Sequence, residues 1–168
     1  MSQKIKLDEY AGKLLSQLPK GAFLSVRAGN NINTMTIGWG AIGYMWAKPI
    51  IIVAVRGSRY TYELIEKTTD FSVSVPLDDQ LKHSLAGAGT QSGRNLDKFA
   101  AFRLTAAQGK TIASPVIKEC QLIFECRIIF KHPIDPSLLN KELNDKFYAN
   151  QDYHVLYYGE ILAQYTND

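Results

Sequence analysis

The segment CQLIFECRIIFK at residues 120–131 most constrains the fold, because apolar and polar side chains alternate along most of its length. Successive side chains of a β-strand point to opposite faces, so the alternation predicts a long strand with one face against a core. The predicted apolar face carries Cys120, Leu122, Phe124, Cys126, Ile128 and Phe130, and the opposite face carries Gln121, Glu125, Arg127 and Lys131. The segment YHVLYYGEILAQY at 153–165 shows a similar pattern. A β-sheet is therefore expected.

Further strands are predicted in the first half of the chain. AFLSVRA at 22–28 and NTMTIGW at 33–39 flank the turn-forming sequence Gly-Asn-Asn at 29–31, which indicates a hairpin. The run IIIVAVR at 50–56 is apolar except at its end, so we expect it at the centre of the sheet. At 71–76, Phe and Val alternate with Ser before a final Pro, which predicts a half-buried strand.

Short helices are predicted between the strands. Leucine and alanine recur at helical spacing over 7–18, where a proline and a glycine then end the pattern. Thr61 is positioned to cap a helix that continues to about Thr68. A polar, helix-like stretch follows at 78–85, and NLDKFAAF at 95–102 predicts one further turn of helix.

The domain organisation is expected to be simple. The 168 residues, 46% of them hydrophobic, suffice for one core, and no repeat or Pro-, Gly- or Ser-rich linker divides 1–168. Six or so strands with a few short helices favour a mainly β domain, built as a closed or split antiparallel β-barrel.

Charge and apolar runs exclude several functional classes. The 19 basic and 16 acidic residues are interspersed and leave a net charge of +3, which argues against a nucleic-acid partner. No apolar run approaches the ~20 residues that cross a bilayer, and MSQKIKLDEY lacks the apolar stretch of a signal peptide. Cys120 and Cys126 lie about 20 Å apart in an extended strand, too far for a disulfide. We expect a cytoplasmic protein without a membrane partner.

A cluster of anion-binding residue types follows the apolar strand at 50–56. Arg56, Ser58, Arg59 and Thr61 occur within six residues, just ahead of a predicted helix N-terminus, where free N–H groups and the helix dipole favour a phosphate. Two solvated arginines in a surface turn are the alternative. Lys98 is a third candidate cation.

The glycine-rich segment GAGTQSG at 87–93 is a second candidate for phosphate contact. Its glycines let backbone N–H groups approach a ligand closely, and the hydroxyls of Thr90 and Ser92 can donate. The spacing matches neither a dinucleotide fingerprint nor a P-loop, so an ordinary glycine-rich turn is the alternative.

Aromatic and polar residues near 33–46 could contact a flat ligand. Trp39 and Trp46 flank a stretch that contains three glycines, although core packing also explains most tryptophans. Asn33, Thr34, Met35 and Thr36 form a polar run in a predicted strand, and a solvent-facing strand surface accounts for both threonines equally well.

No pattern predicts a metal site or a covalent nucleophile. His83, His132 and His154 show no paired spacing with each other or with the cysteines, as a zinc site would require. No serine or cysteine is linked to a base in a recognisable motif. No catalytic residue is assigned.

Five segments, taken together, resemble the flavin-reductase-like, FMN-binding split-barrel family, which includes flavoredoxins. They are NTMTIGWG (33–40), KPIIIVAVRGSRYTYELI (48–65), FSVSVP (71–76), GTQSGRNLDKF (89–99) and YHVLYYGEI (153–161). They occur in the family's order and cover nearly the whole chain from about Gly21.

The resemblance implies a homodimer of split barrels with FMN bound non-covalently near the subunit interface. The strand formed by Asn33, Thr34, Met35 and Thr36 would run beside the isoalloxazine, with Trp39 close by. The residues expected around the phosphate and the ribityl chain are Arg56, Ser58, Arg59, Thr61, Ser92, Gly93 and Lys98. His154 matches a histidine of the family's terminal strand, and no role is assigned to it.

Three functions are compatible with this resemblance. In the first, NAD(P)H transiently donates hydride to flavin N5, which makes the chain a flavin reductase. In the second, a redox protein partner reduces a flavoredoxin-type electron carrier, and in the third the chain only binds FMN. Several relatives have a cysteine before Gly89 where this chain has Ala88, so a mechanism that needs a thiol there is not expected.

Overall fold

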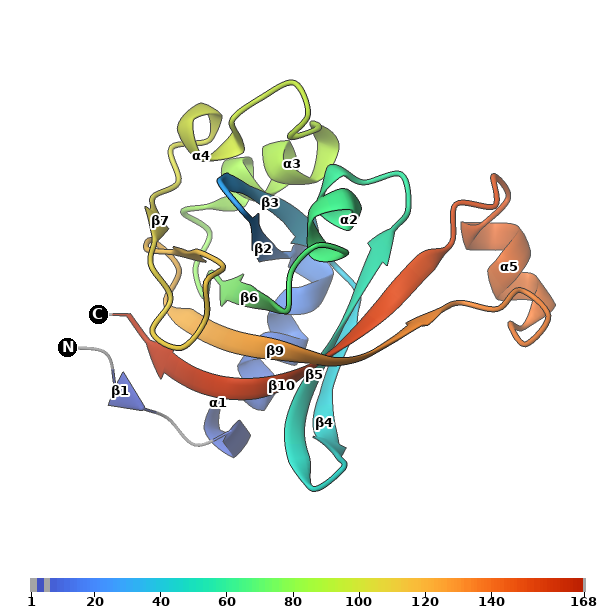
Figure 1. The fold of residues 1–168 in the computed structure, drawn as a ribbon, viewed down its shortest axis with the longest axis horizontal. Helices are drawn as coiled ribbons and strands as arrows, with labels where there is room; N and C mark the ends of the chain where they lie inside the picture. Colours follow the sequence, from blue (N-terminus) through green and yellow to red (C-terminus); the bar gives the residue numbers. More distant parts are fainter. Residues whose placement is uncertain (1–2, 5–6, 168) are drawn as a thin grey trace.

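A computed structural model describes residues 3–4 and 7–167 of the chain, and it has a mainly β architecture with short helices (Figure 1). The strands are β1 (Gln3–Lys4), β2 (Ala22–Ala28), β3 (Asn31–Ile37), β4 (Gly40–Met45), β5 (Lys48–Arg56), β6 (Asp70–Val75), β7 (Ala106–Ala107), β8 (Val116–Ile117), β9 (Leu122–Pro133) and β10 (His154–Thr166). The helices are α1 (Leu7–Gln17), a 3₁₀ turn (Leu18–Lys20), α2 (Tyr60–Ile65), α3 (Lys82–Thr90), α4 (Lys98–Ala101) and α5 (Lys141–Phe147).

The main sheet is antiparallel and has the order β3-β2-β6-β9-β10-β5-β4, with β1 paired to the end of β10. The sheet curls so that β3 and β5 face each other, but no hydrogen-bond ladder joins them. The chain crosses this split at Gly38 and Trp39, between β3 and β4. The expected split antiparallel barrel is confirmed, and β5 lies between two neighbours as its apolar sequence predicts.

The barrel interior holds the main core. It is formed by alternate residues of the long strands, such as Leu24, Val53, Val73 and Phe124, all fully buried. The predicted first helix is confirmed as α1, which buries Leu14 against this core. The hairpin predicted around residues 29–31 is also present, with Gly29 at a positive φ of 58°.

A second apolar layer covers the outer face of β2, β6 and β9. It buries a strand that was expected to be half-buried and a carboxylate that was expected on a polar face. Segment 99–120 packs there with α3, so the strand β6 is buried on both faces. Its Ser72 and Ser74 are fully buried and hydrogen-bond the backbone of Pro115 and Ile117.

Glu125 of β9 was expected on a polar strand face, but it is 0% exposed under residues 110–114. Its carboxylate accepts hydrogen bonds from the backbone N–H groups of Lys110 and Thr111, at 2.7 and 2.6 Å. The hydroxyl of Tyr165 donates to the same group at 2.6 Å. These protein donors therefore take the place of the water molecules that would solvate the carboxylate on an exposed strand face.

The two cysteines are buried and free, as expected. Cys120 lies just before β9 rather than within it, and its backbone N–H bonds Ile117. Cys126 packs in the barrel core, whereas Cys120 packs in the outer layer. No described helix is long and apolar enough to span a bilayer.

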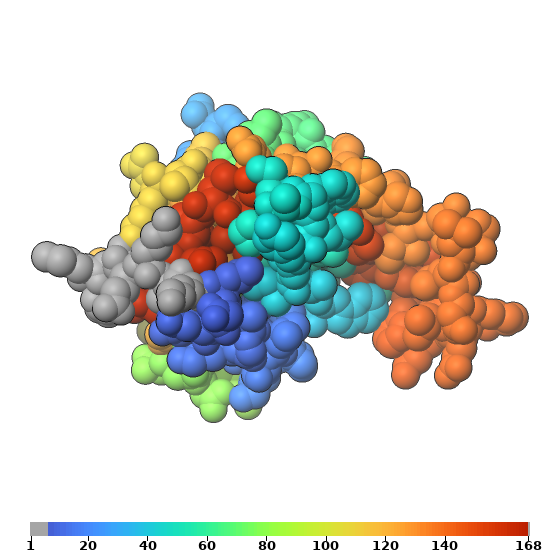
Figure 2. Space-filling model, turned by 90° about the horizontal axis from the view of Figure 1, so that it is seen from below, coloured from blue at the N-terminus to red at the C-terminus, as the bar shows by residue number. Residues whose placement is uncertain are grey.

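Two projections extend from the barrel. Residues 134–153, here named the arm, carry α5 away from the sheet (Figure 1). The β4–β5 hairpin stands on the lower face beside α1 (Figure 2). At its tip Trp46 packs edge-on against Phe130 and Tyr158. Trp39, seven residues earlier, contacts a different pair of rings, those of Phe147 and His154.

Candidate functional site in the barrel split

Two adjoining cavities open at the split between β3 and β5. Cavity 1 has a volume of about 220 Å³ and cavity 2 about 180 Å³, and both are lined by Met35 and Arg59. Cavity 1 is further lined by Thr36, Ile37, Gly38, Trp39, Ala54, Arg56 and His154. Cavity 2 is further lined by Asn33, Ser58, Tyr60, Thr61, Thr90, Gln91, Ser92, Gly93, Arg94 and Lys98. Together they form one elongated site.

The strand β3 supplies alternate residues to this site. Asn33 and Met35 line the cavities, and Asn33 donates its amide N–H to the Thr61 hydroxyl at 2.9 Å. The intervening threonines point the other way, since successive strand residues face opposite sides. Thr34 is fully buried, and its hydroxyl donates to the carbonyl oxygen of Leu24. It lines neither cavity and does not face solvent, so both expectations for Thr34 are wrong.

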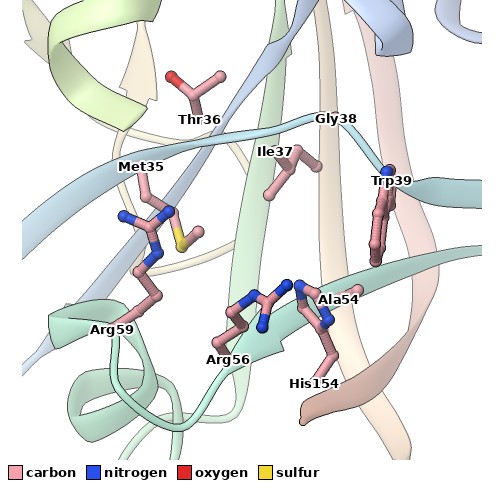
Figure 3. Close-up of a pocket in the computed structure, with 9 residues that line it drawn as sticks. All are labelled: Met35, Thr36, Ile37, Gly38, Trp39, Ala54, Arg56, Arg59 and His154. Atoms are coloured by element: carbon pink, nitrogen blue, oxygen red, sulfur yellow. The ribbon is translucent and has the colours of Figure 1, made fainter. Parts of the chain in front are cut away.

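Thr36 lines cavity 1, but its side chain points away from the other lining residues (Figure 3). The hydroxyl donates to the carbonyl oxygen of Leu85 in α3, at 2.6 Å. Its side chain therefore fixes α3 on β3, and a ligand would meet the backbone at this position.

Cavity 2 contains two cations without a counter-ion. Lys98 is 4% exposed, and its Nζ donates to the carbonyl oxygen of Ala88 at 2.7 Å. Arg59 donates to the next carbonyl, that of Gly89, at 2.8 Å. Within the described ranges, no carboxylate forms a salt bridge with either side chain. Burial, and then the charge of Arg59, lowers the pKa of Lys98 to about 8.

This arrangement fits a phosphate. A buried cation is costly unless an anion or several hydrogen bonds compensate for the lost water, and carbonyl oxygens provide only part of that compensation. A dianionic phosphate would supply the missing charge and accept further hydrogen bonds from Lys98 and Arg59. Space is provided at Gly93, where an added Cβ would lie 2.1 Å from Asn33 Oδ1.

The other predicted phosphate residues take different roles. Ser58 and Ser92 line cavity 2, but the Ser58 hydroxyl donates to Asp152 at 2.6 Å. Thr61 does not cap α2, whose N-cap is Arg59; it lies buried inside the helix and accepts from Asn33.

Arg56 lies away from Lys98 and cavity 2. Its guanidinium donates to the carbonyl oxygens of Asp152 and Phe147, at 2.7 and 3.1 Å, and so holds the base of the arm. It lines cavity 1 beside Trp39 and His154 rather than cavity 2 (Figure 3). A backbone partner 91 residues away cannot be inferred from local sequence.

The glycine-rich segment is mostly helical, so its predicted loop is wrong. Gly87 and Gly89 lie in α3, where a Cβ at Gly87 would meet the Phe102 ring at 2.1 Å. A Cβ at Gly89 would lie 3.2 Å from Thr36. These glycines allow close helix packing, and only Gly93, beyond the helix, lines cavity 2.

Cavity 1 has an aromatic wall. The ring centroids of Trp39 and His154 lie 5.0 Å apart, and the edge of Phe147 from the arm packs on Trp39 at the same distance. Burial, and then Arg56, lowers the pKa of His154 to about 4, so the imidazole is neutral at physiological pH. Its Nδ1 lies 2.7 Å from the Tyr148 hydroxyl.

Sequence reasoning missed several lining residues. Arg94 lies at the rim of cavity 2, where it pairs with Glu63 and donates to the backbone of Ser58. It stands directly after Gly93 in the segment that resembles the family, which is the signal that could have identified it. Ala54 and Tyr60 lie within another of those segments, 48–65, so the same signal applies to them.

The fold and the cavity define a split-barrel protein with one elongated site, cationic at one end and aromatic at the other. The profile of the family described as "Flavin reductase like domain" matches residues 16–168, so the chain belongs to this family. The family assignment made from the five sequence segments is confirmed.

The chain is also similar to individual proteins. An uncharacterized protein of Archaeoglobus fulgidus is 35% identical over 144 residues, which cover 86% of this chain and 71% of the relative. The structure of a flavoredoxin from Methanosarcina acetivorans has a TM-score of 0.70 at 26% identity, covering 88% of this chain and 68% of that one. An FMN-binding protein from Thermus thermophilus has a TM-score of 0.68 at 23% identity, covering 86% and 68%.

Proposed function

We propose that the chain binds FMN non-covalently in the split and acts as an NAD(P)H-dependent flavin reductase. The observation that carries the proposal is the pair Lys98 and Arg59, two neighbouring cations that have no carboxylate partner among the described residues. Family membership and the FMN named for the Thermus thermophilus protein support the choice of ligand.

Each end of the site has a distinct task in this proposal. Lys98 and Arg59 bind the phosphate, and Asn33 and Met35 line the path from cavity 2 toward cavity 1. Trp39, with Phe147 of the arm packed against its ring, forms an aromatic wall of cavity 1. Bound FMN would supply hydride and electron transfer, and the protein supplies orientation and nearby positive charge.

The test is the visible spectrum of FMN-reconstituted protein under anaerobic conditions, before and after NADPH and then NADH. We expect the flavin band to survive desalting and to bleach with one nicotinamide. Loss of the band on desalting would contradict the bound-cofactor proposal. Retention without bleaching would contradict the reductase proposal and favour an electron carrier reduced by a protein partner, for which the similarity to a flavoredoxin is the supporting observation.

We also propose that residues 1–168 act as one domain and that two copies associate through the hairpin tip. Tyr44, Met45, Trp46 and Phe130 are all exposed large hydrophobic residues, between 42% and 71%, and Trp46 and Phe130 are in contact. Contiguous apolar patches of this kind are typical of protein interfaces. The exposed edge strand β4 adjoins the patch.

A further inference from the structure

The histidine of cavity 1 is held by a residue from the arm. Tyr148 follows α5, is 4% exposed and places its hydroxyl oxygen 2.7 Å from His154 Nδ1. Its ring stacks on Tyr153 with centroids 4.7 Å apart, and the Tyr153 hydroxyl donates to Asn144 at 2.6 Å. The phenol therefore cannot turn away without disrupting this stack.

The hydrogen-bond pattern fixes where the protons are. In residues 3–4 and 7–167, the Tyr148 hydroxyl has no hydrogen-bond partner except His154. Burial raises the pKa of Tyr148, so the phenol keeps its proton. That proton has an acceptor only if it is donated to Nδ1, and a neutral imidazole then carries its own proton on Nε2.

The other ring nitrogen is open to cavity 1. Nε2 of His154 has no hydrogen-bond partner within the described residues. Every fully buried side-chain N or O atom of those residues does have a partner, so Nε2 is not fully buried. Nε2 is therefore accessible, and His154 is one of the residues that line cavity 1 (Figure 3). The same cavity is lined by the Trp39 ring and the apolar side chains of Ile37 and Ala54, and also by Arg56 and Arg59.

We infer that Tyr148 is a positioning residue, which holds His154 as the Nε2–H tautomer so that it donates a hydrogen bond to an uncharged carbonyl oxygen in cavity 1. A neutral N–H donor beside an aromatic ring suits the carbonyl oxygen of a flat, conjugated compound. The flavin ring's own carbonyl edge and a second small carbonyl compound share this chemistry. Only the identity of the occupant rests on the proposed function.

The tautomer is tested on FMN-free protein by two-bond ¹⁵N–¹H correlation spectra of the histidine rings, because protonated and unprotonated ring nitrogens have well separated ¹⁵N shifts. We expect His154 to show a protonated Nε2 and an unprotonated Nδ1. Tyr148→Phe keeps the ring stack but removes the donor, so the signals should move toward a tautomer mixture and the pKa of His154 should rise. A protonated Nδ1 in the native protein, or an unchanged pattern in Tyr148→Phe, would overturn the inference.

The occupant is tested by following the Nε2–H signal during titrations with two probes. A shift on adding FMN identifies the flavin as the acceptor. A shift only when 4-hydroxyacetophenone is added to FMN-loaded protein, and not with the carbonyl-free 4-ethylphenol, identifies a second ligand. In either case Tyr148→Phe should weaken that ligand roughly three- to tenfold, as expected for one hydrogen bond. No shift with either carbonyl probe contradicts the donor role, and the desalting experiment separately reports whether FMN binds.

Discussion

Lys98 and Arg59 donate to consecutive carbonyl oxygens at the end of α3, those of Ala88 and Gly89. Two like charges are thus brought together by the backbone of one helix, and no carboxylate of the part of the chain that the structure describes forms a salt bridge with either. Their mutual repulsion is a cost that an anionic ligand would reverse.

The double substitution Lys98→Ala with Arg59→Ala should weaken FMN binding by about 100-fold or more. A charge-assisted hydrogen bond contributes on the order of 1.5 to 3 kcal/mol, and two such groups are removed. Fluorescence titration of FMN into the protein measures the dissociation constant. Lys118→Ala, at an exposed position remote from both cavities, is the matched control. An unchanged dissociation constant in the double variant would remove the proposed phosphate site.

FMN affinity should fall as the pH rises above about 8. The free protein loses the Lys98 proton near that pH, whereas a bound phosphate keeps Lys98 charged. By linkage the dissociation constant then rises by up to about tenfold per pH unit. Titrations at pH 7 and pH 9 measure the effect, and Lys98→Met should abolish it. Equal pH dependence in the native protein and in Lys98→Met would argue against this role.

Stability of the FMN-free protein should show the opposite trend. The pKa of Lys98 is lower in the folded chain than in the unfolded chain, so between about pH 8 and 10.5 the unfolded chain binds more protons. The contribution of Lys98 to the free energy of unfolding therefore rises with pH across this window. Urea denaturation of the native protein and of Lys98→Met isolates that contribution, which must vanish in the variant.

Gly93→Ala should abolish FMN binding while leaving the barrel folded. The added methyl group would lie 2.1 Å from Asn33 Oδ1 and 2.9 Å from the Tyr60 ring, both in the lining of cavity 2. Gly57→Ala is the control in the neighbouring turn, since nothing lies within 4 Å of a Cβ there. Circular dichroism checks the fold and desalting checks flavin retention. Equal retention by both variants would show that cavity 2 is not used.

Glu125→Ala should lower the free energy of unfolding by about 3 kcal/mol or more, because several buried donors lose their acceptor. Chemical denaturation measures the difference. Glu119→Ala, which removes the acceptor of one exposed backbone N–H at Thr105, should cost much less. Similar losses in the two variants would contradict the assigned role of the buried carboxylate.

Tyr44→Lys with Trp46→Lys should shift the protein from dimer to monomer, since each places a charge in the apolar patch at the hairpin tip. Sedimentation velocity measures the shift. Leu15→Lys, at a 52% exposed position on α1, is the control. A monomeric native protein, or a dimer that survives the double change, would exclude this surface as the interface.

The sequence predicts the strands well because their apolar faces repeat every second residue, as β9 and β10 show. It fails where a distant segment changes the surroundings of a strand. Glu125 and Ser72 look solvent-facing by alternation, but residues 110–115 cover them. The sequences of β6 and β9 themselves do not indicate that residues 110–115 pack over them.

Arg59 lies far in the sequence from Gly93 and Lys98, and the family resemblance is what grouped the three residues from the sequence alone. All three line cavity 2. The placement of Arg56 at the base of the arm and the contact of Tyr148 with His154 depend on how a 20-residue excursion folds back. The secondary-structure propensities of residues 134–153 do not predict which barrel residues the arm contacts.

The unpaired edge of β3 lies across both cavities from β5, so whatever occupies the split stands where a neighbouring strand would. A ligand that binds the folded chain alone stabilises it by RT ln(1 + [L]/Kd), or about 2.7 kcal/mol at a hundredfold excess over Kd. If the proposed FMN is that ligand, the amount of folded protein in a cell would depend on its supply. A ligand bound in the split would thus add to the free energy of unfolding, as contacts with a neighbouring strand would.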